Sequence, residues 1–500
     1  AYVGGHWIDA DSGATHPVTN PATGQTIAEV AKCGTAETRR AIEAAEQALP
    51  AWRKKPANER AAILRKWFDL MMAAQEDLAQ ILTAEQGKPL AEARGEVIYG
   101  ASFIEWFAEE AKRVYGDVIP AAMNDRRYLV IRQPVGVIAA ITPWNFPIAM
   151  ITRKCAPALA AGCTVLVKPS ELTPLCALAL AELATRAGFP AGVFNVLTTS
   201  DASGVGRTLT ASPTVRKLSF TGSTAVGKLL IRDCAETVKK VSMELGGNAP
   251  FIVFDDADLD AAVAGAMASK YRNAGQTCVG PDYLFLPEGK VAEFAGHCRD
   301  IMAKRYTGLD DPAYTSIADE KSFRRLLDWL EDAREKGASV SKLLVGPDHE
   351  AAHRKIAPML VTGVNEDMVL MREEIFGPFL PVMTYRSIDE VLDYINERER
   401  PLALYLFTRD KALQDRVIKN TLSGGVCLND CVLHAAQHDM PFGGIGNSGM
   451  GQYHGPEGFN ELSKLRPVFR QALHPATALL HPPYGKVWNF VYRLMMRFDI

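Results

Sequence analysis

Segments with strand patterns alternate with segments with helix patterns from about residue 128 onward, and this alternation restricts the fold more than any other feature. The strand patterns are GVIAAIT, TVLVKPS, VFNVLT and LSFTGS, and the helix patterns are IAMITRKCAPALAAG, PLCALALAELATRAG and TAVGKLLIRDCAE. Such alternation predicts βαβ units around a parallel sheet. It begins again at APFIVFDD, so we predict two successive α/β domains with a boundary near residue 246.

Length, charge and cysteine count exclude several other classes of protein. The 500 residues exceed what one hydrophobic core organises, and 48% apolar with 23% charged residues is typical of a globular protein. A net charge of -3 predicts no nucleic-acid partner. Nine cysteines without a short disulfide framework, and no signal-peptide pattern at the start, predict a cytoplasmic protein.

The tail VWNFVYRLMMRFDI has apolar residues at helical spacing, with Arg493 and Arg497 interleaved. Its pattern is compatible with two structures. A last helix that packs on the body or on a partner subunit is the favoured one. A helix that lies on a membrane surface is the alternative.

Cys278, in NAGQTCVGPD, is the candidate nucleophile, although a lone cysteine after a helix is more commonly a small buried hydrophobe. A nucleophilic cysteine needs a base, and no histidine occurs between His16 and His297. Glu244, in VSMELGG, is a candidate base, because a carboxylate in a partly apolar site has a raised pKa. A distant histidine such as His434 remains an alternative.

Asn145 lies in the rigid turn TPWNFP, where its amide could donate to a developing oxyanion or simply cap the turn. No HExxH, CxxC or carboxylate cluster accompanies the chain's histidines, so we predict no metal site.

The segment KLSFTGSTAVGK, residues 217–228, is the stronger of two candidate phosphate sites. A strand enters the turn at Gly222, Ser223 is suited to cap the next helix, and Gly227 lies inside that helix. Its free N–H groups could bind a pyrophosphate, but an ordinary βα turn has the same pattern. The weaker candidate is the G-x-G-x-x-G match at Gly444, which lacks a preceding strand and indicates close backbone approach instead.

Seven motifs together resemble the NAD(P)-dependent aldehyde dehydrogenase superfamily: TPWNFP, KPSE, FTGST, MELGG, GQTC, EEIFGP and PFGG, in the family's order. The resemblance implies an α/β fold with a Rossmann-type coenzyme domain, an α/β catalytic domain and a β oligomerisation arm. The implied boundaries are 1–118 with 137–245 for the coenzyme domain, 246–425 for the catalytic domain, 119–136 with 456–475 for the arm, and 476–500 for the tail.

The resemblance also implies a mechanism, in which Cys278 attacks an aldehyde, Asn145 stabilises the oxyanion and Glu244 activates the water that hydrolyses a thioester. NAD is the implied cofactor, with NADP as the second choice, since a carboxylate at Glu171 favours a free ribose diol. The arm implies a homodimer or homotetramer. The implied cofactor-binding residues are Trp144, Lys168, Glu171, Gly222, Ser223, Gly227, Leu245, Glu374 and Phe376.

The two halves of the chain resemble different branches of this superfamily. Residues up to about 278 resemble succinate-semialdehyde dehydrogenases, whereas later segments such as TLSGGVCLND resemble coniferyl-aldehyde dehydrogenases, which indicates a chimera or a natural mosaic. Arg153 and Arg272 match positions that hold a substrate carboxylate in the first branch, so a semialdehyde acid is the expected substrate. An aromatic or aliphatic aldehyde, and a cofactor-independent thiol esterase activity, are the alternatives.

Overall fold

The structure is a computed structural model that describes residues 1–121, 124, 126–471, 473, 481–482 and 484–497. Its chain divides into two compact units. The first contains residues 1–112 and 134–462, and the second contains the described residues of 113–133 and 463–500. Parts of the expected arm and tail lie outside the described residues.

The first sheet of the first unit has eight strands, of which the central five are parallel in the order β9-β8-β7-β10-β11. The strand order reverses between β7 and β10, and ligands of such sheets bind beyond the carboxyl ends of the strands at that reversal. From edge to edge the strands are β2 (His6–Trp7), β1 (Tyr2–Val3), β9 (Phe194–Val196), β8 (Thr164–Lys168), β7 (Val137–Ile141), β10 (Val215–Thr221), β11 (Lys240–Glu244) and β21 (Gly449–Met450).

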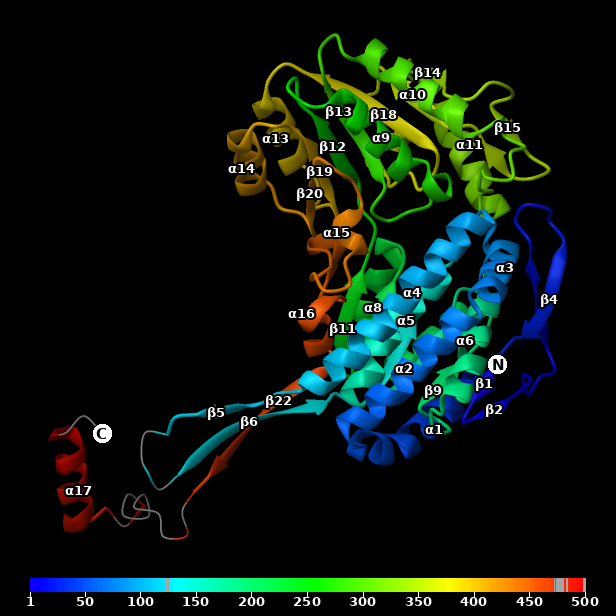
Figure 1. Ribbon diagram of the computed structural model, residues 1–500. Coiled ribbons are helices and arrows are strands. Elements are labelled where there is room, and N and C mark those ends of the chain that lie inside the picture. The colour runs from blue at the N-terminus through cyan, green and yellow to red at the C-terminus, as the bar shows by residue number, and fades with distance from the viewer. Residues whose placement is uncertain (122–123, 125, 472, 474–480, 483, 498–500) are drawn as a thin grey trace. The chain divides into compact units, whose positions relative to one another are not determined.

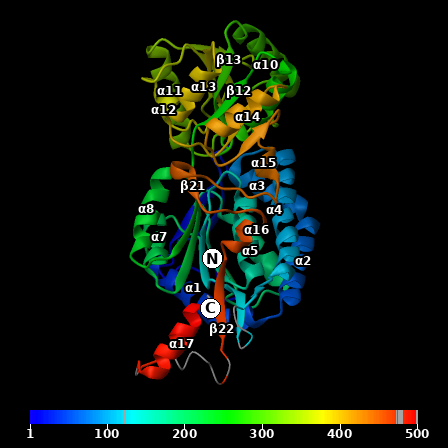
Figure 2. The same ribbon diagram turned by 90° about the vertical axis from the view of Figure 1, so that its left-hand side faces the viewer.

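Helices cover both faces of this sheet, as the view in Figure 2 shows. Every residue of β7 is buried, because alternate side chains point to opposite faces and both faces are covered. One face carries α1 (Thr35–Lys54), α7 (Ala202–Ala211) and α8 (Thr224–Ala235). The other carries α2 (Ala57–Ala73), α3 (Gln75–Gln86), α4 (Leu90–Glu110), α5 (Pro147–Ala161) and α6 (Pro174–Ala187).

The second sheet begins at β12, four residues after β11 ends, so the change of sheet falls at the expected position near residue 246 (Figure 1). Six of its seven strands are parallel, and β14 is antiparallel at one edge. In order the strands are β14 (Ser339–Lys342), β17 (Met359–Thr362), β18 (Phe379–Tyr385), β13 (Pro281–Pro287), β12 (Ala249–Val253), β19 (Leu404–Phe407) and β20 (Val426–Leu428).

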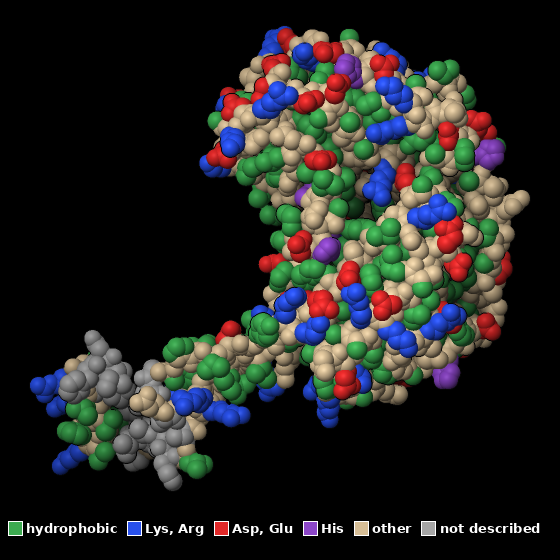
Figure 3. Space-filling view, in the orientation of Figure 1, with side chains coloured by type: hydrophobic (Ala, Val, Ile, Leu, Met, Phe, Trp, Pro, Cys, Tyr) green, Lys and Arg blue, Asp and Glu red, His purple; other side chains and the backbone are tan. Residues whose placement is uncertain are grey.

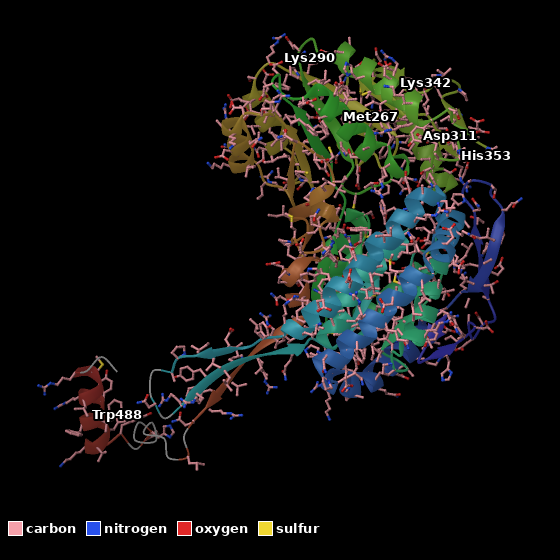
Figure 4. The ribbon with its side chains drawn as sticks, in the orientation of Figure 1. Met267, Lys290, Asp311, Lys342, His353 and Trp488 are labelled. Atoms are coloured by element: carbon pink, nitrogen blue, oxygen red, sulfur yellow. The ribbon has the colours of Figure 1, made fainter. Side chains whose placement is uncertain are left out.

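Two separate apolar clusters cover the faces of this second sheet. Phe251 packs with α9 (Leu259–Lys270) and α10 (Val291–Arg305), whereas its neighbour Ile252 packs with α11 (Glu320–Glu335), α13 (Ile388–Asn396) and α14 (Lys411–Asn420). Met267 of α9 lies in the first cluster, while Lys290, Lys342 and His353 lie toward the periphery (Figure 4). The predicted α/β fold with two successive parallel sheets is confirmed.

Shorter elements complete the described chain. Two hairpins are formed by β3 (Thr15–Thr19) with β4 (Thr26–Ala31) and by β15 (His349–Glu350) with β16 (Lys355–Ile356). The short helices are α12 (Val369–Arg372), α15 (Leu433–Ala436) and α16 (Gly455–Asn460), with 3₁₀ turns η1 (Ala111–Arg113), η2 (Arg272–Gly275) and η3 (Gly446–Ser448).

The second unit contains a three-stranded sheet in the order β22-β6-β5 and a C-terminal helix. Its strands are β5 (Asp117–Ile119), β6 (Arg127–Pro134) and β22 (Ser463–Arg470). The second segment of the arm was expected to begin at residue 456. Instead Pro456 opens α16, which buries Phe459 in the first unit, and the arm strand begins only at Ser463.

The C-terminal helix α17 (Lys486–Arg497) is amphipathic. Val487, Phe490 and Leu494 are exposed on it, and Trp488 stacks on Tyr492 with 5.0 Å between ring centroids (Figure 4). Helical spacing places Lys486, Arg493 and Arg497 together on one stripe, with Phe490 beside them. The described helix therefore has an apolar face available for a partner, and contact with a membrane surface stays a prediction.

The G-x-G-x-x-G segment completes the edge of the first sheet. β21 pairs antiparallel with β11, and Gly449 lies opposite Glu244 in the register. Gly449 has φ of +142°, and a Cβ atom there would lie 2.2 Å from the carbonyl oxygen of Met243. The expected close backbone approach is confirmed, and it fixes the end of the strand that carries Glu244.

Replacing Gly449 with alanine should destabilise this strand end. The methyl group would meet a backbone carbonyl that cannot rotate away, and overpacking together with an unfavourable φ costs about 3 kcal/mol or more. Gly446→Ala is the matched control, because Gly446 also has positive φ but open space around its Cβ position. We expect Gly449→Ala to lower the thermal unfolding temperature clearly more than the control does; equal shifts would contradict the proposed crowding.

Candidate active site

The two sheets bring three predicted site residues together from distant parts of the chain. Asn145 follows the carboxyl end of β7, and Glu244 is the last residue of β11. Cys278 lies between η2 and β13, just before the amino end of a strand in the second sheet. The site therefore lies where the carboxyl edge of the first sheet meets the loops that lead into the second.

Cys278 and Glu244 are neighbours. The thiol Sγ of Cys278 lies 3.6 Å from Oε1 of Glu244, and Cys278 is half-buried whereas Glu244 is fully buried. This distance lets the carboxylate reach a proton next to the sulfur directly or through one water molecule. The structure thus brings the predicted nucleophile and the predicted base into one site.

Three side chains surround the carboxylate of Glu244. Thr221 donates its hydroxyl to Oε2 at 2.7 Å, the guanidinium of Arg153 forms an ion pair with the same oxygen, and Lys154 Nζ lies 4.0 Å from it. Arg153 is also buried, with its guanidinium over the rings of Phe442 and Tyr453. A buried carboxylate needs such partners, since an isolated buried charge is strongly unfavourable.

The electrostatics of Cys278 combine opposing effects. Burial raises the pKa of its thiol from 9.0 to about 11, because a thiolate loses hydration in this site. The positive charge of Arg153 acts in the opposite direction, as does that of Lys154 more weakly, while the negative charge of Glu374 raises the pKa further. Arg153 is thus the main charge that promotes thiolate formation here.

Asn145 is buried and directed toward the cysteine loop. Its side-chain Nδ2 donates to the carbonyl oxygen of Gln276 at 3.1 Å, two residues before Cys278. An amide nitrogen carries two hydrogens, so the second one remains for an oxyanion near Cys278. This geometry fits the predicted oxyanion donor.

A cavity of about 290 Å³ opens on one side of Cys278 and contains both arginines expected to bind a substrate. Arg272 is nearly half-exposed in it and lies 4.0 Å from Glu92, whereas Arg153 is held against Glu244. The remaining walls are mainly apolar or aromatic and include Tyr99, Phe146, Met150, Val432 and Phe442. The cavity suits a short apolar chain that ends in an anionic group.

A second cavity, of about 250 Å³, lies on the other side of the Cys278–Glu244 pair. Six of the nine predicted cofactor residues line this cavity, and a seventh packs against one of them. Trp144 and Phe376 form its aromatic wall, with ring centroids 5.6 Å apart in an edge-to-face arrangement. The predicted residues in its lining are Trp144, Gly222, Ser223, Leu245, Glu374 and Phe376, and Gly227 packs against Leu245.

The turn beside this cavity fits a dinucleotide phosphate. Ser223 is the N-cap of α8, and its hydroxyl accepts from the N–H of Val226 at 3.5 Å. A Cβ atom on Gly227 would lie 2.4 Å from Leu245, so glycine allows the first turn of α8 to approach that residue closely. A strand, a glycine turn and a capped helix N-terminus are the elements that bind a pyrophosphate.

Lys168 and Glu171 lie at the end of β8, outside the linings of both cavities. Lys168 Nζ donates to the carbonyl oxygen of Pro169 and lies 3.9 Å from Glu171, which is about half-exposed. They border the same carboxyl edge of the sheet as the turn at Gly222. Glu374, by contrast, lines the second cavity, where burial and the neighbouring Asp282 raise the pKa of its carboxyl group from 4.5 to about 8.

Lys154 and Thr221 are site residues that sequence reasoning missed. Both touch the group around Glu244, and burial together with Arg153 lowers the pKa of Lys154 well below its usual value. The only indication of their role in the sequence was that they adjoin the predicted residues Arg153 and Gly222. A sequence neighbour can point to the opposite side of the same helix or strand, so this indication was insufficient.

The described part of the chain adds two general observations. No described helix is long and apolar enough to cross a membrane, and the described residues contain no group of three or more histidine, cysteine, aspartate or glutamate side chains arranged to hold a metal. Lysine, arginine, aspartate and glutamate side chains are interspersed on the face of the first unit in Figure 3.

Comparison with known proteins agrees with this geometry. The aldehyde dehydrogenase family model matches residues 7–468. The chain is 51% identical to glutarate-semialdehyde dehydrogenase of Pseudomonas aeruginosa over 469 residues, covering 93% of this chain and 96% of that protein. It is 50% identical to an NADP(+) succinate-semialdehyde dehydrogenase of Escherichia coli, with the same coverage.

Solved structures give the same result. The crystal structure of succinate-semialdehyde dehydrogenase from Burkholderia pseudomallei superposes with a TM-score of 0.90 at 48% identity, covering 94% of this chain and 97% of that one. All these matches continue on both sides of residue 278, and the change of resemblance expected there stays a prediction. The predicted family is confirmed: this chain belongs to the aldehyde dehydrogenase family.

Proposed function

We propose that this protein oxidises a semialdehyde acid, of the size of succinate or glutarate semialdehyde, to the dicarboxylate with NAD(P)+. The observation that carries the proposal is the position of the Cys278–Glu244 pair between two cavities. One cavity fits the nicotinamide end of a dinucleotide, and the other has apolar walls and Arg272. The semialdehyde dehydrogenases that resemble the whole chain support this substrate class over coniferyl or aliphatic aldehydes and over a thiol esterase.

Cys278 begins the reaction as a thiolate. Its sulfur forms a bond to the aldehyde carbon, and the carbonyl oxygen becomes an oxyanion in a thiohemiacetal. The free N–H of the Asn145 amide donates to that oxygen. Arg153 favours this step, because its positive charge lowers the pKa of the thiol.

The nicotinamide cofactor, when bound, supplies the hydride acceptor that converts the thiohemiacetal to a thioester. Trp144 and Phe376 flank the cavity that would hold the ring beside Cys278. Glu171 would accept hydrogen bonds from a ribose diol and repel a 2′-phosphate, so NAD+ is preferred and NADP+ is second. The ratio of kcat/KM for the two cofactors measures this preference.

Glu244 completes the cycle. It accepts a proton from water, the water oxygen bonds to the thioester carbon, and the carbon–sulfur bond breaks to release the acid and the Cys278 thiolate. Burial favours the protonated form of a carboxylate, whereas Arg153 and Thr221 stabilise the ionised form that can act as a base.

Glu244→Gln should stop the reaction after one turnover. The amide cannot accept the proton from water, so we expect a burst of about one NADH per active site and then a steady rate at least about 100-fold lower. The measurement is stopped-flow absorbance with excess aldehyde. Added hydroxylamine, which attacks a thioester without a base, serves as the control and should restore turnover; full steady turnover in the variant would remove Glu244 from this role.

Arg272 is the more accessible cation for a substrate carboxylate, because it is nearly half-exposed and lies 4.0 Å from Glu92, whereas Arg153 is buried against Glu244. Arg272→Gln should raise KM for succinate semialdehyde by about 30-fold, which corresponds to one lost charge-assisted hydrogen bond. For butanal, which has no carboxylate, we expect less than about a threefold change. Arg299→Gln, at an exposed position on α10, is the matched control; equal losses for both aldehydes would contradict this assignment.

We also propose that the second unit joins copies of this chain into a homo-oligomer. Its strands expose Val118, Ile119, Ile131, Leu465 and Phe469, and β5 is an unpaired edge in the described sheet. Exposed apolar edge strands favour pairing with another chain.

The double substitution Val118→Asp and Ile119→Asp should shift the mass in light scattering toward that of one chain, because charges on an edge strand oppose pairing. Val345→Asp, at an exposed position of the first unit, should leave the mass unchanged. If the doubly substituted protein still forms the full oligomer, the interface between copies does not involve β5. Flotation with anionic vesicles separately tests the alternative that α17 lies on a membrane.

A further inference from the structure

A fully buried ion pair lies beneath the turn that carries Asn145. Lys88 Nζ and Glu96 Oε2 are 2.5 Å apart, and neither side chain is accessible to solvent. Removing two charges from water is costly, and their attraction often fails to offset that cost. An apolar pair of similar volume would pack equally well, so packing alone does not explain why two charged side chains are buried here.

The lysine holds the catalytic turn from one side. Its Nζ also donates to the main-chain carbonyl oxygen of Asn145 at 2.8 Å and lies 3.9 Å from the ring centroid of Phe146. Three groups on three sides thus fix the ammonium. Lys88 therefore sets the position of the backbone from which the Asn145 side chain projects.

The glutamate holds the other end of the same turn. Its Oε1 accepts from the N–H groups of Ile148 at 3.0 Å and Ala149 at 3.4 Å, in the first turn of α5. A carboxylate there satisfies N–H groups that have no partner within the helix and complements the helix dipole. The ion pair consequently clamps residues 145–149 from both sides.

A chain of buried amides extends the clamp to the cysteine loop. Gln86 accepts from the N–H of Lys88 and donates to Oδ1 of Asn273 at 3.0 Å. Asn273 Nδ2 donates to the carbonyl oxygens of Asn145 at 3.3 Å and Gln276 at 3.2 Å. The Gln276 carbonyl also accepts from the Asn145 side chain, so one network fixes the oxyanion donor relative to Cys278.

We propose that the Lys88–Glu96 ion pair is a positioning device for the oxyanion donor Asn145. Neither residue touches the reacting atoms; both hold the turn so that the free amide N–H of Asn145 points at the oxygen bound to the carbon that Cys278 attacks. The proposal rests on the function above. A misplaced Asn145 amide stabilises the oxyanion less well. Because that oxyanion exists only after Cys278 has attacked, the effect falls on the chemical step rather than on aldehyde binding.

The test compares Lys88→Met, Glu96→Gln and the apolar double variant Lys88→Met with Glu96→Leu. We expect each to lower the NADH burst rate by about 30-fold, since loss of one donor costs 100-fold or more and misplacement somewhat less. KM should stay within about twofold. The rate of Cys278 alkylation by iodoacetamide, which forms no oxyanion, should stay unchanged.

Lys217→Met is the matched control, because Lys217 is equally buried and is paired with Glu461 without contacting Asn145. It should lower the unfolding temperature but leave the burst rate near that of the wild type. The double variant carries no unpaired buried charge and keeps the test valid if the single variants fold poorly. A double variant with a wild-type burst rate would overturn the proposal, as would parallel losses of burst and alkylation rates. A wild type that forms no NADH from succinate semialdehyde, even in the steady state, would instead refute the proposed function itself.

Discussion

The contact between the buried carboxylate of Glu244 and the thiol of Cys278 is the constraint on which this structure depends. Glu244 ends a strand of the first sheet, whereas Cys278 lies in the loop that leads into the second, so a distance of 3.6 Å requires the carboxyl end of β11 and the loop before β13 to be fixed together. Backbone pairing of Glu244 with Gly449 provides one restraint, and Thr221 provides another. The order of strands in the first sheet then places the turn of Asn145 and the glycine turn at the same edge.

Sequence reasoning predicted the parts of the fold that follow from local pattern. Alternation of apolar strands and helices predicted both parallel sheets, and the Gly-Gly pair after Glu244 marked the change of sheet. The resemblance placed the second arm segment from residue 456, where the structure has the short helix α16, and such a short helix has too few residues to show a period.

Side-chain partners were less predictable than the fold. Arg153 was expected to meet a substrate carboxylate; it lines the cavity of Arg272, but its guanidinium is paired with Glu244 at the end of β11. Glu96 lies in α4 and Lys88 in the loop before it, within a charged stretch whose pattern resembles a solvated surface. Their burial is set by tertiary packing, so no spacing rule could distinguish them from the exposed charges of the same stretch.

Two groups of buried charged side chains lie around the reacting atoms. Arg153, Lys154 and Glu244 form one group, and Lys88 with Glu96 form the other, all nearly inaccessible to water. Such groups weaken stability compared with an apolar core, because each ion loses its hydration. The same loss of water makes their fields strong and their positions fixed before the substrate arrives, so little reorganisation is needed when charge develops on the aldehyde oxygen. The unfavourable burial and the catalytic advantage therefore arise from the same physical cause.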